Sequence, residues 1–204
     1  MNGCVIVDTR HVPNIRAIVE SHIDFTGWDV TFFVGAFNYA YIMSELKGLN
    51  VTFIKTDLYT LNEYGYNILL TSKEFWQQIP YDKVLIFQHD SRLLRKGVED
   101  FLQWDYVGAP WLWQKFGGNG GLSLRTKSVM LEIIKANPYE STMGNEDVYF
   151  CNSMHRNVNY KLAPRYVCES FSCEAIFKLE TFGYHAIEKW MSKEQCNQIK
   201  KQYL

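Results

Sequence analysis

Acidic residues at two places in the sequence have the type and the surroundings that catalysis requires. Asp90 follows the apolar run of residues 84–87, and Glu146 and Asp147 precede the apolar residues 148–150. A carboxylate that ends a buried strand is a natural ligand for Mg²⁺ or Mn²⁺, which prefer oxygen donors and substrate phosphates. A carboxylate at a half-buried helix start can act as a general base, because burial raises its pKa toward neutrality. Structural roles remain open, since Asp90 can cap a turn and the acidic pair can favour the positive end of a helix dipole.

A glycine-rich run and a late histidine add to these candidates. Four of the five residues 117–121 are glycine, so the backbone there can approach a ligand closely. The run lacks the Gly-Lys-Ser/Thr ending of a P-loop and does not match the GxGxxG dinucleotide fingerprint, and a flexible hairpin connection is the alternative. His185 can bind a cation through one ring nitrogen, and Lys189 can neutralise a diphosphate. The alternative for His185 is a hydrogen-bonded structural residue among aromatic neighbours.

The order of apolar and amphipathic stretches predicts the elements that position these residues. We expect strands at 4–7, 30–34, 51–54, 84–87, 106–111 and 122–125, and helices at 13–23, 41–47, 68–79, 127–137 and from 145. This alternation predicts a Rossmann-like α/β fold, with a mixed, mostly parallel sheet flanked by helices. We expect a single domain over residues 1–204, because no linker, repeat or low-complexity segment interrupts the chain.

The carboxyl edge of such a sheet is where ligands bind. The polar residues expected at this edge are Asp8-Thr9-Arg10, Lys55-Thr56-Asp57 and His89-Asp90-Ser91. His89 is expected to point away from Asp90, because neighbouring side chains of an extended backbone lie on opposite sides.

Composition and charge argue against several classes of protein. A net charge of −1 without a basic cluster does not fit a nucleic-acid surface. We see no signal peptide, and no apolar run approaches the ~20 residues that span a bilayer, so no membrane span is expected. Five cysteines without a CxxC pair predict reduced thiols in a cytoplasmic protein. The 16% aromatic content indicates either an aromatic core or rings that line a sugar-binding groove.

Taken in order, six segments resemble one family, a largely uncharacterised glycosyltransferase-like family of the GT-A superfamily. That family carries a Gln-x-Asp-Ser strand end, a Tyr-x-Gly-Ala-Pro-Trp segment, an Asn-Gly-Gly-x-Ser-Leu-Arg block and an Asn-Glu-Asp motif. The matching segments here are residues 87–91, 105–111, 118–125, 145–147, 171–174 and 182–185. The layout is also distantly similar to that of the β-1,4-galactosyltransferases.

The resemblance implies a glycosyltransferase that uses Mn²⁺ or Mg²⁺ and a UDP- or GDP-type nucleotide-sugar donor. Asp90 matches the last Asp of the superfamily's Asp-x-Asp and His185 matches its late His, so these two are the expected metal ligands. Gln88 stands where the first Asp would be, which leaves Asp90 as the ligand at the strand end. Gly120 and Gly121 match the glycine segment that lines the donor site.

The resemblance also implies roles on both sides of the reacting sugar. Asp147 would be the general base, Glu146 would hold a glycan or other hydroxyl acceptor, and the anomeric centre would be inverted. Trp111 and Trp113 would form an acceptor platform or, alternatively, anchor the core or a loop. Residues 1–91 would form a nucleotide-binding half and residues 92–204 an acceptor and catalytic half. The donor-binding candidates are Asp8, Thr9, Arg10, Asn67, Lys73, Gln88, His89, Asp90, Gly120, Gly121 and Lys189.

Two other functions remain as alternatives. A sugar-nucleotide nucleotidyltransferase also uses a Rossmann-like sheet and a carboxylate-bound cation, although no Gly-rich signature ending in Lys or Arg is visible near the first strand. A catalytically inactive sugar-binding protein is compatible with Gln88 in place of the first Asp.

Overall fold

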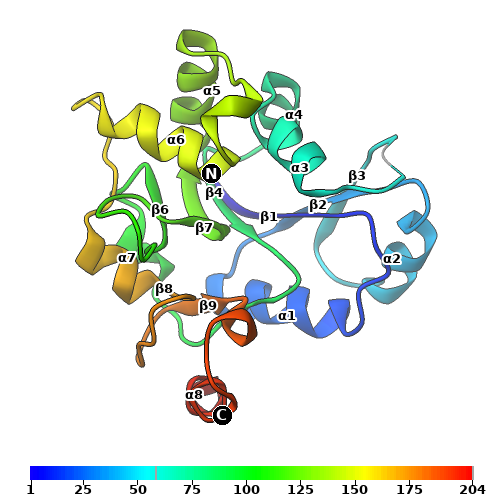
Figure 1. The fold of residues 1–204 in the computed structure, drawn as a ribbon. Coiled ribbons are helices and arrows are strands. Elements are labelled where there is room, and N and C mark those ends of the chain that lie inside the picture. The colour runs from blue at the N-terminus through cyan, green and yellow to red at the C-terminus, as the bar shows by residue number, and fades with distance from the viewer. Residues whose placement is uncertain (58, 204) are drawn as a thin grey trace.

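The computed structural model describes residues 1–57 and 59–203, which form a central six-stranded sheet with helices on both faces (Figure 1). The strand order is β3-β2-β1-β4-β7-β6. The parallel strands are β1 (Asn2–Asp8), β2 (Val30–Val34), β3 (Val51–Lys55) and β4 (Lys83–Phe87). β7 (Asn119–Thr126) runs antiparallel to both β4 and β6 (Tyr106–Ala109). The predicted mixed, mostly parallel α/β sheet is confirmed.

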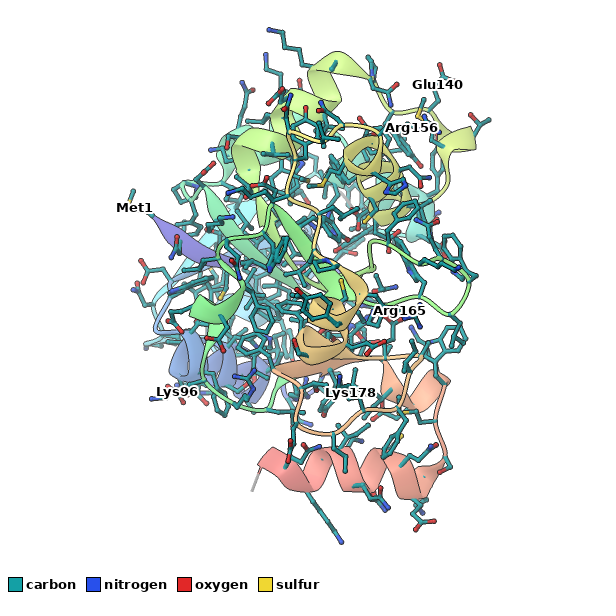
Figure 2. All side chains as sticks on the ribbon, turned by 90° about the vertical axis from the view of Figure 1, so that its left-hand side faces the viewer. Met1, Lys96, Glu140, Arg156, Arg165 and Lys178 are labelled. Atoms are coloured by element: carbon teal, nitrogen blue, oxygen red, sulfur yellow. The ribbon has the colours of Figure 1, made fainter. Side chains whose placement is uncertain are left out.

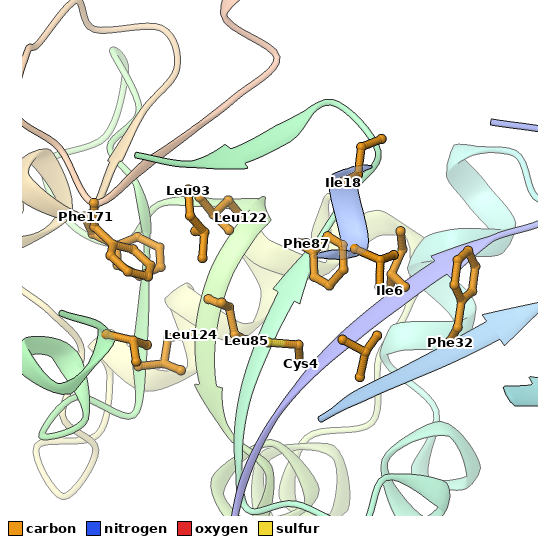
Figure 3. Close-up of a cluster of buried hydrophobic side chains, with 14 of the residues drawn as sticks. Cys4, Ile6, Ile18, Phe32, Leu85, Phe87, Leu93, Leu122, Leu124 and Phe171 are labelled. Carbon is orange, nitrogen blue, oxygen red and sulfur yellow. The ribbon is translucent and has the colours of Figure 1, made fainter. Parts of the chain in front are cut away.

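Alternation along the strands buries both faces of the sheet. Cys4 and Ile6 of β1 belong to one buried cluster, whereas Val5 and Val7 belong to another on the opposite face. The first cluster, shown in Figure 3, includes residues of α1 (Ile15–Thr26), α2 (Tyr39–Glu45) and α7 (Arg165–Phe171). The second includes residues of α3 (Glu63–Leu70), α4 (Lys73–Gln78), α5 (Lys127–Ala136) and α6 (Glu146–His155).

Two elements differ from the sequence-based expectation. The single helix expected over residues 68–79 is two helices, α3 and α4, because the Ser72 hydroxyl accepts the backbone N–H of Phe75 and starts a new helix. The strand expected at 122–125 begins earlier, at Asn119, so part of the glycine-rich run lies within β7. This part of the run is therefore held in the sheet and is not a flexible hairpin.

A smaller sheet joins the C-terminal part of the chain to the end of β4. Its order is β5 (Ser91–Leu93), β9 (Gly183–His185) and β8 (Ser172–Cys173). The remaining elements are α8 (Lys193–Lys200) and the 3-10 helices η1 (Val98–Phe101), η2 (Ser141–Met143), η3 (Ile187–Lys189) and η4 (Lys201–Tyr203).

Charged side chains gather at the periphery of the molecule. Figure 2 shows Lys96, Glu140 and Arg156 at the outside of the packed interior, and all three are exposed. None of the helices formed by the described residues is long and apolar enough to cross a membrane.

Candidate active site

The chain turns sharply after β4, and this turn carries the first group of candidates. Ser91 donates its backbone N–H to the Gln88 carbonyl oxygen at 3.0 Å, which closes the turn. The expectation that His89 points away from Asp90 is wrong, because the backbone is not extended at these residues. His89 Nδ1 lies 4.0 Å from Asp90 Oδ1 and 3.7 Å from Asp8 Oδ2. The turn therefore directs His89 toward the carboxyl end of β1 and keeps its ring near Asp90.

Asp90 and His185 meet because β5 pairs with β9. The register places Ser91 opposite His185, and the backbone N–H of Ala186 donates to the Asp90 carbonyl oxygen at 3.2 Å. As a result, Asp90 Oδ1 lies 3.3 Å from His185 Nε2. The structure thus brings together the two residues that the sequence suggested as metal ligands.

The donor atoms at this junction fit a divalent cation. Asp90 Oδ1 is buried without a hydrogen-bond partner, and Gln88 Oε1 lies 3.1 Å from His185 Nε2. Oxygen donors with one imidazole nitrogen suit Mn²⁺ or Mg²⁺. Among residues 1–57 and 59–203, no group of three or more His, Cys, Asp or Glu side chains is arranged to hold a metal ion. Asp90 and His185 would therefore supply only part of a coordination shell, and substrate oxygens or water would complete it.

The charges at this junction balance one another. Burial alone would raise the pKa of Asp90, but positively charged neighbours, led by His185, hold it well below its usual range. Burial lowers the pKa of His185, but Asp90 and Glu174 outweigh that effect and raise it to about 9. Lys189 Nζ lies 3.7 Å from Asp90 Oδ2. Asp90 is consequently an anion at neutral pH, and a cation that binds His185 Nε2 must displace the proton held there.

Glu174, which follows β8, contacts His185 from the other side of its ring. Its Oε1 lies 3.5 Å from His185 Nδ1, and the residue is 7% exposed. A carboxylate at one ring nitrogen sets the orientation of the imidazole and directs the other nitrogen outward. No role was predicted for Glu174, although it lies in one of the segments, 171–174, that carried the family resemblance. An acidic residue just after a buried strand was the available signal.

Gly120 and Gly121 leave the room that these side chains occupy. A Cβ on Gly121 would lie 2.2 Å from the Nε2 and Cε1 atoms of His185. A Cβ on Gly120 would lie 2.3 Å from Glu146 Oε1 and 2.5 Å from a terminal nitrogen of Arg125. Both separations are far below van der Waals contact. The two glycines are therefore required by the close approach of side chains from other elements.

We expect Gly121→Ala to damage the junction without unfolding the protein. The added methyl group must displace the His185 ring, and misplacing a catalytic group by about 1 Å can reduce the rate 10²-fold. The readouts are Mn²⁺ binding by calorimetry and the rate of any metal-stimulated reaction. Gly27→Ala is a matched control, because it meets no atom within 4 Å but carries a positive φ of 70° at the end of α1. The control should lose ~1 kcal/mol of stability and keep Mn²⁺ binding; equal Mn²⁺ affinity in both variants would contradict the assignment of His185.

Asp147 lies in the first turn of α6 and faces β7. Its Oδ2 accepts the backbone N–H of Gly120 at 2.9 Å, and its Oδ1 accepts that of Val148 at 2.7 Å. Burial, together with the neighbouring charge of Glu146, raises the pKa of Asp147 to about 7 despite these hydrogen bonds. A carboxylate with such a pKa is matched to proton abstraction near neutrality.

Glu146 is engaged by Arg125 at the end of β7. Both Glu146 oxygens accept hydrogen bonds from the guanidinium, one of them at 2.9 Å, and both side chains are buried. Arg125 Nε donates to Ser123 Oγ at 2.9 Å, and the guanidinium lies over the Tyr106 ring at 5.0 Å. Glu146 was expected to hold an acceptor, and the structure shows both of its carboxylate oxygens engaged by Arg125 at the wall of the central cavity described below. Arg125 was not predicted as a site residue; an arginine that ends an apolar strand in a matched segment was its signal.

Asn67 and Lys73 were both expected to bind the donor, and the structure places them far apart in role: Asn67 at the start of α6 and Lys73 on the surface. Asn67 Oδ1 accepts the backbone N–H of Glu146 at 2.9 Å, and Asn67 Nδ2 donates to Asn145 Oδ1 at 3.1 Å. Asn67 thereby fixes the start of α6. Lys73 is exposed on the first turn of α4 and lines none of the three site cavities described next.

Three adjoining cavities form a cleft along the carboxyl edge of the sheet. The β1 cavity, about 240 Å³, is lined by Val7, Asp8, Thr9, Arg10, Leu61, Asn62, Glu63, Tyr66 and Gln88. The central cavity, about 280 Å³, shares Glu63, Tyr66 and Gln88 with it and adds Gly120, Gly121, Glu146, Asp147, Glu174, His185 and Lys189, among others. The tryptophan cavity, about 280 Å³, is lined by residues 110–113, Asn119, Asn145, Asp147, Val148, Glu174, Ala175 and Trp190. Because they share lining residues, the three cavities adjoin one another.

The β1 cavity opens where the strand order reverses between β1 and β4, the usual ligand site of open α/β sheets. Asp8 is buried and accepts from the side chain and the backbone N–H of Arg10. Arg10 also contacts His89 Nδ1 at 2.9 Å. Thr9 Oγ1 accepts the backbone N–H of Leu61 at 3.0 Å and so holds the segment around Leu61, which forms another wall of the cavity.

The two predicted platform residues, Trp111 and Trp113, both line the tryptophan cavity but differ in exposure. Trp111 is 9% exposed and anchors the loop in the core, whereas Trp113 is 64% exposed and stacks on it at 5.0 Å. Trp190, for which no role was predicted, is 57% exposed and lines both this cavity and the central one. Sequence offered no signal for Trp190 beyond its position next to Lys189.

Comparisons with known proteins agree with the fold. A family model described as "Protein of unknown function (DUF5672)" matches residues 48–185. No curated protein matches the sequence. The apo-form glycosyltransferase GlyE of Streptococcus pneumoniae TIGR4 is similar in structure, with a TM-score of 0.57 and 10% identity over 100% of this chain. The chain spans 60% of the length of that GlyE chain, and the likeness shows a shared fold.

HddC from Yersinia pseudotuberculosis is a more distant neighbour. It matches with a TM-score of 0.47 and 14% identity over 68% of this chain and 81% of that chain.

Proposed function

The chain belongs to the DUF5672 family of unknown function, and from its site we propose that it transfers a sugar from a nucleotide-diphosphate-sugar donor to an acceptor hydroxyl. The observation that carries this proposal is the central cavity. It combines His185, which contacts Asp90, with Asp147, whose pKa is raised to about 7. His185 of the candidate cation site and the candidate base therefore line one cavity, which adjoins a further cavity on each side.

The β1 cavity is the proposed place for the nucleotide. Its position at the strand-order reversal suits a mononucleotide, and Arg10 is held beside it by Asp8 and His89. Lys189, 66% exposed at its side chain, stands next to Asp90 and can neutralise a diphosphate that reaches the central cavity. The donor sugar would then lie between the metal-binding pair and Asp147.

Asp90 and His185 are the residues that would hold Mn²⁺ or Mg²⁺, with Glu174 fixing the orientation of His185. A divalent cation bound there supplies Lewis-acid stabilisation of the departing diphosphate. Gln88 Oε1, 3.1 Å from His185 Nε2, is a further oxygen at the same place.

Asp147 is the proposed general base, which takes the proton from the acceptor hydroxyl as that oxygen attacks the anomeric carbon. Glu146 is a positioning residue in this proposal, because its carboxylate is held by Arg125 and its charge helps to keep the pKa of Asp147 high. Attack by the acceptor from the side opposite the leaving diphosphate inverts the anomeric centre in a single displacement.

The cation assignment is tested with Asp90→Asn and His185→Gln. Each is expected to lower Mn²⁺-stimulated transfer or donor hydrolysis by at least ~10²-fold, since each removes one of two protein ligands. Calorimetric Mn²⁺ titration in the presence of a nucleoside diphosphate provides a readout independent of turnover. Lys73→Ala is the control and should behave as wild type, because Lys73 lies outside the cleft.

Other outcomes point to other functions. Unchanged Mn²⁺ dependence in both variants would reject the cation site. Pyrophosphate release from a nucleoside triphosphate and a sugar phosphate would identify a nucleotidyltransferase. Binding of nucleotide sugars without turnover would identify a catalytically inactive sugar-binding protein.

A further inference from the structure

The tryptophan cavity has the properties of a sugar site in its own right. Trp113 and Trp190 come from separate loops, line the same cavity, and are 64% and 57% exposed. Large aromatic rings left in contact with water beside a cleft are typical of a binding surface. The apolar C–H face of a pyranose ring stacks on an indole ring, whereas most other hydrophilic ligands have no such face.

The cavity also carries groups that recognise hydroxyls. Asn119 and Asn145 present side-chain amides, which can both donate and accept hydrogen bonds. Asn145 is already oriented by Asn67, and the side-chain Oδ1 of Asn119 accepts the backbone N–H of Gly121 at 2.7 Å. Asp147 lies in the wall, so a hydroxyl of a sugar bound here can reach the proposed base.

The charged side chains that line the cavity are of one sign. Among the described lining residues, the ionisable ones are Asp147 and Glu174, and no lysine or arginine is present. Lys189, the neighbouring cation, lines the central cavity and faces Asp90. Within a partly desolvated cavity, a ligand carboxylate or phosphate would meet two acidic side chains in the wall, whereas the cation that contacts Glu174, His185, is not among the lining residues.

From these features, we propose that the tryptophan cavity binds an uncharged pyranose as the acceptor and excludes sugars that carry a carboxylate or a phosphate. This inference rests on the proposed function. The ring stacks against Trp113 and Trp190, Asn119 and Asn145 bind its hydroxyls, and Glu174 repels anionic substituents. Anionic groups of the donor are accommodated separately, beside Arg10 and Lys189.

Equilibrium binding tests this without requiring turnover. Neutral methyl glycosides of common hexoses and N-acetylhexosamines are titrated against their matched uronides and 6-phosphates, with tryptophan fluorescence and ligand-observed NMR as readouts. Titrations are made with and without Mn²⁺ and a nucleoside diphosphate. At least one neutral glycoside should bind, and its anionic counterparts should bind at least tenfold more weakly at low salt.

Variants separate the stacking from the charge effect. Trp113→Ala and Trp190→Ala should each weaken binding of the neutral glycoside at least fivefold, while the exposed aromatic control Tyr166→Ala should not. Glu174→Gln should reduce the difference in affinity between neutral and anionic sugars. High salt should reduce the same difference in the wild type. Failure of every neutral glycoside to bind, or equal binding of the anionic ones, overturns the inference. Neutral binding with no transfer from any donor upholds this site and instead contradicts the proposed function.

Discussion

Replacing Asp147 with asparagine is expected to lower kcat for transfer by ~10²–10⁴-fold, the usual contribution of a general base. Asparagine nearly matches aspartate in size but cannot take a proton from the acceptor. Donor affinity, measured by thermal shift or calorimetry, should change little, because the β1 cavity does not include Asp147. A wild-type kcat in Asp147→Asn would show that another group removes the proton.

The pH dependence gives a second check on Asp147. The base must be ionised to act, so the rate of the wild type should rise with pH and level off above a pKa of about 7. Stability should move in the opposite direction. Because folding raises this pKa from 3.8, the stability associated with Asp147 is full below about pH 4 and is lost as pH rises through 7. The free energy of unfolding of wild type minus Asp147→Asn should therefore decrease from pH 4 to pH 8.

Replacing Arg125 with methionine is expected to reduce the free energy of unfolding by ~3–5 kcal/mol, because it leaves the buried Glu146 carboxylate without its partner. The measurement is equilibrium denaturation in urea at pH 7.

Two further variants sharpen this prediction. Arg125→Met combined with Glu146→Gln removes the uncompensated charge and should recover part of the lost stability. Arg95→Met is the control, because Arg95 pairs with Asp100 at 3.6 Å on the surface, where such a pair contributes at most ~1 kcal/mol. A loss below ~1 kcal/mol in Arg125→Met would contradict the view that this pair supports the start of α6.

Local sequence was sufficient to predict where the strands of the central sheet lie and which ionisable residues follow them. The strands of the first half could be predicted because both faces of a parallel sheet are buried, which produces continuous apolar runs such as 84–87. The helix break at Ser72 was missed, because the apolar periodicity continues through it while the cap hydrogen bond changes the backbone direction. Asp90, Asp147 and His185 could be singled out by residue type, position and family resemblance.

Contacts between distant segments decided how these residues are arranged. The pairing of β5 with β9 brings His185 to Asp90, and the pairing of β1 with β4 brings Asp8 and Arg10 to His89. Neither is visible in local periodicity, since each depends on hydrogen bonds that only the folded chain can form. The Arg125–Glu146 pair likewise joins β7 to α6 and engages both oxygens of the carboxylate that was expected to hold an acceptor. Sequence by itself determined which groups are available for chemistry, whereas the tertiary structure decided which of them face the cleft, because burial and pairing act through space.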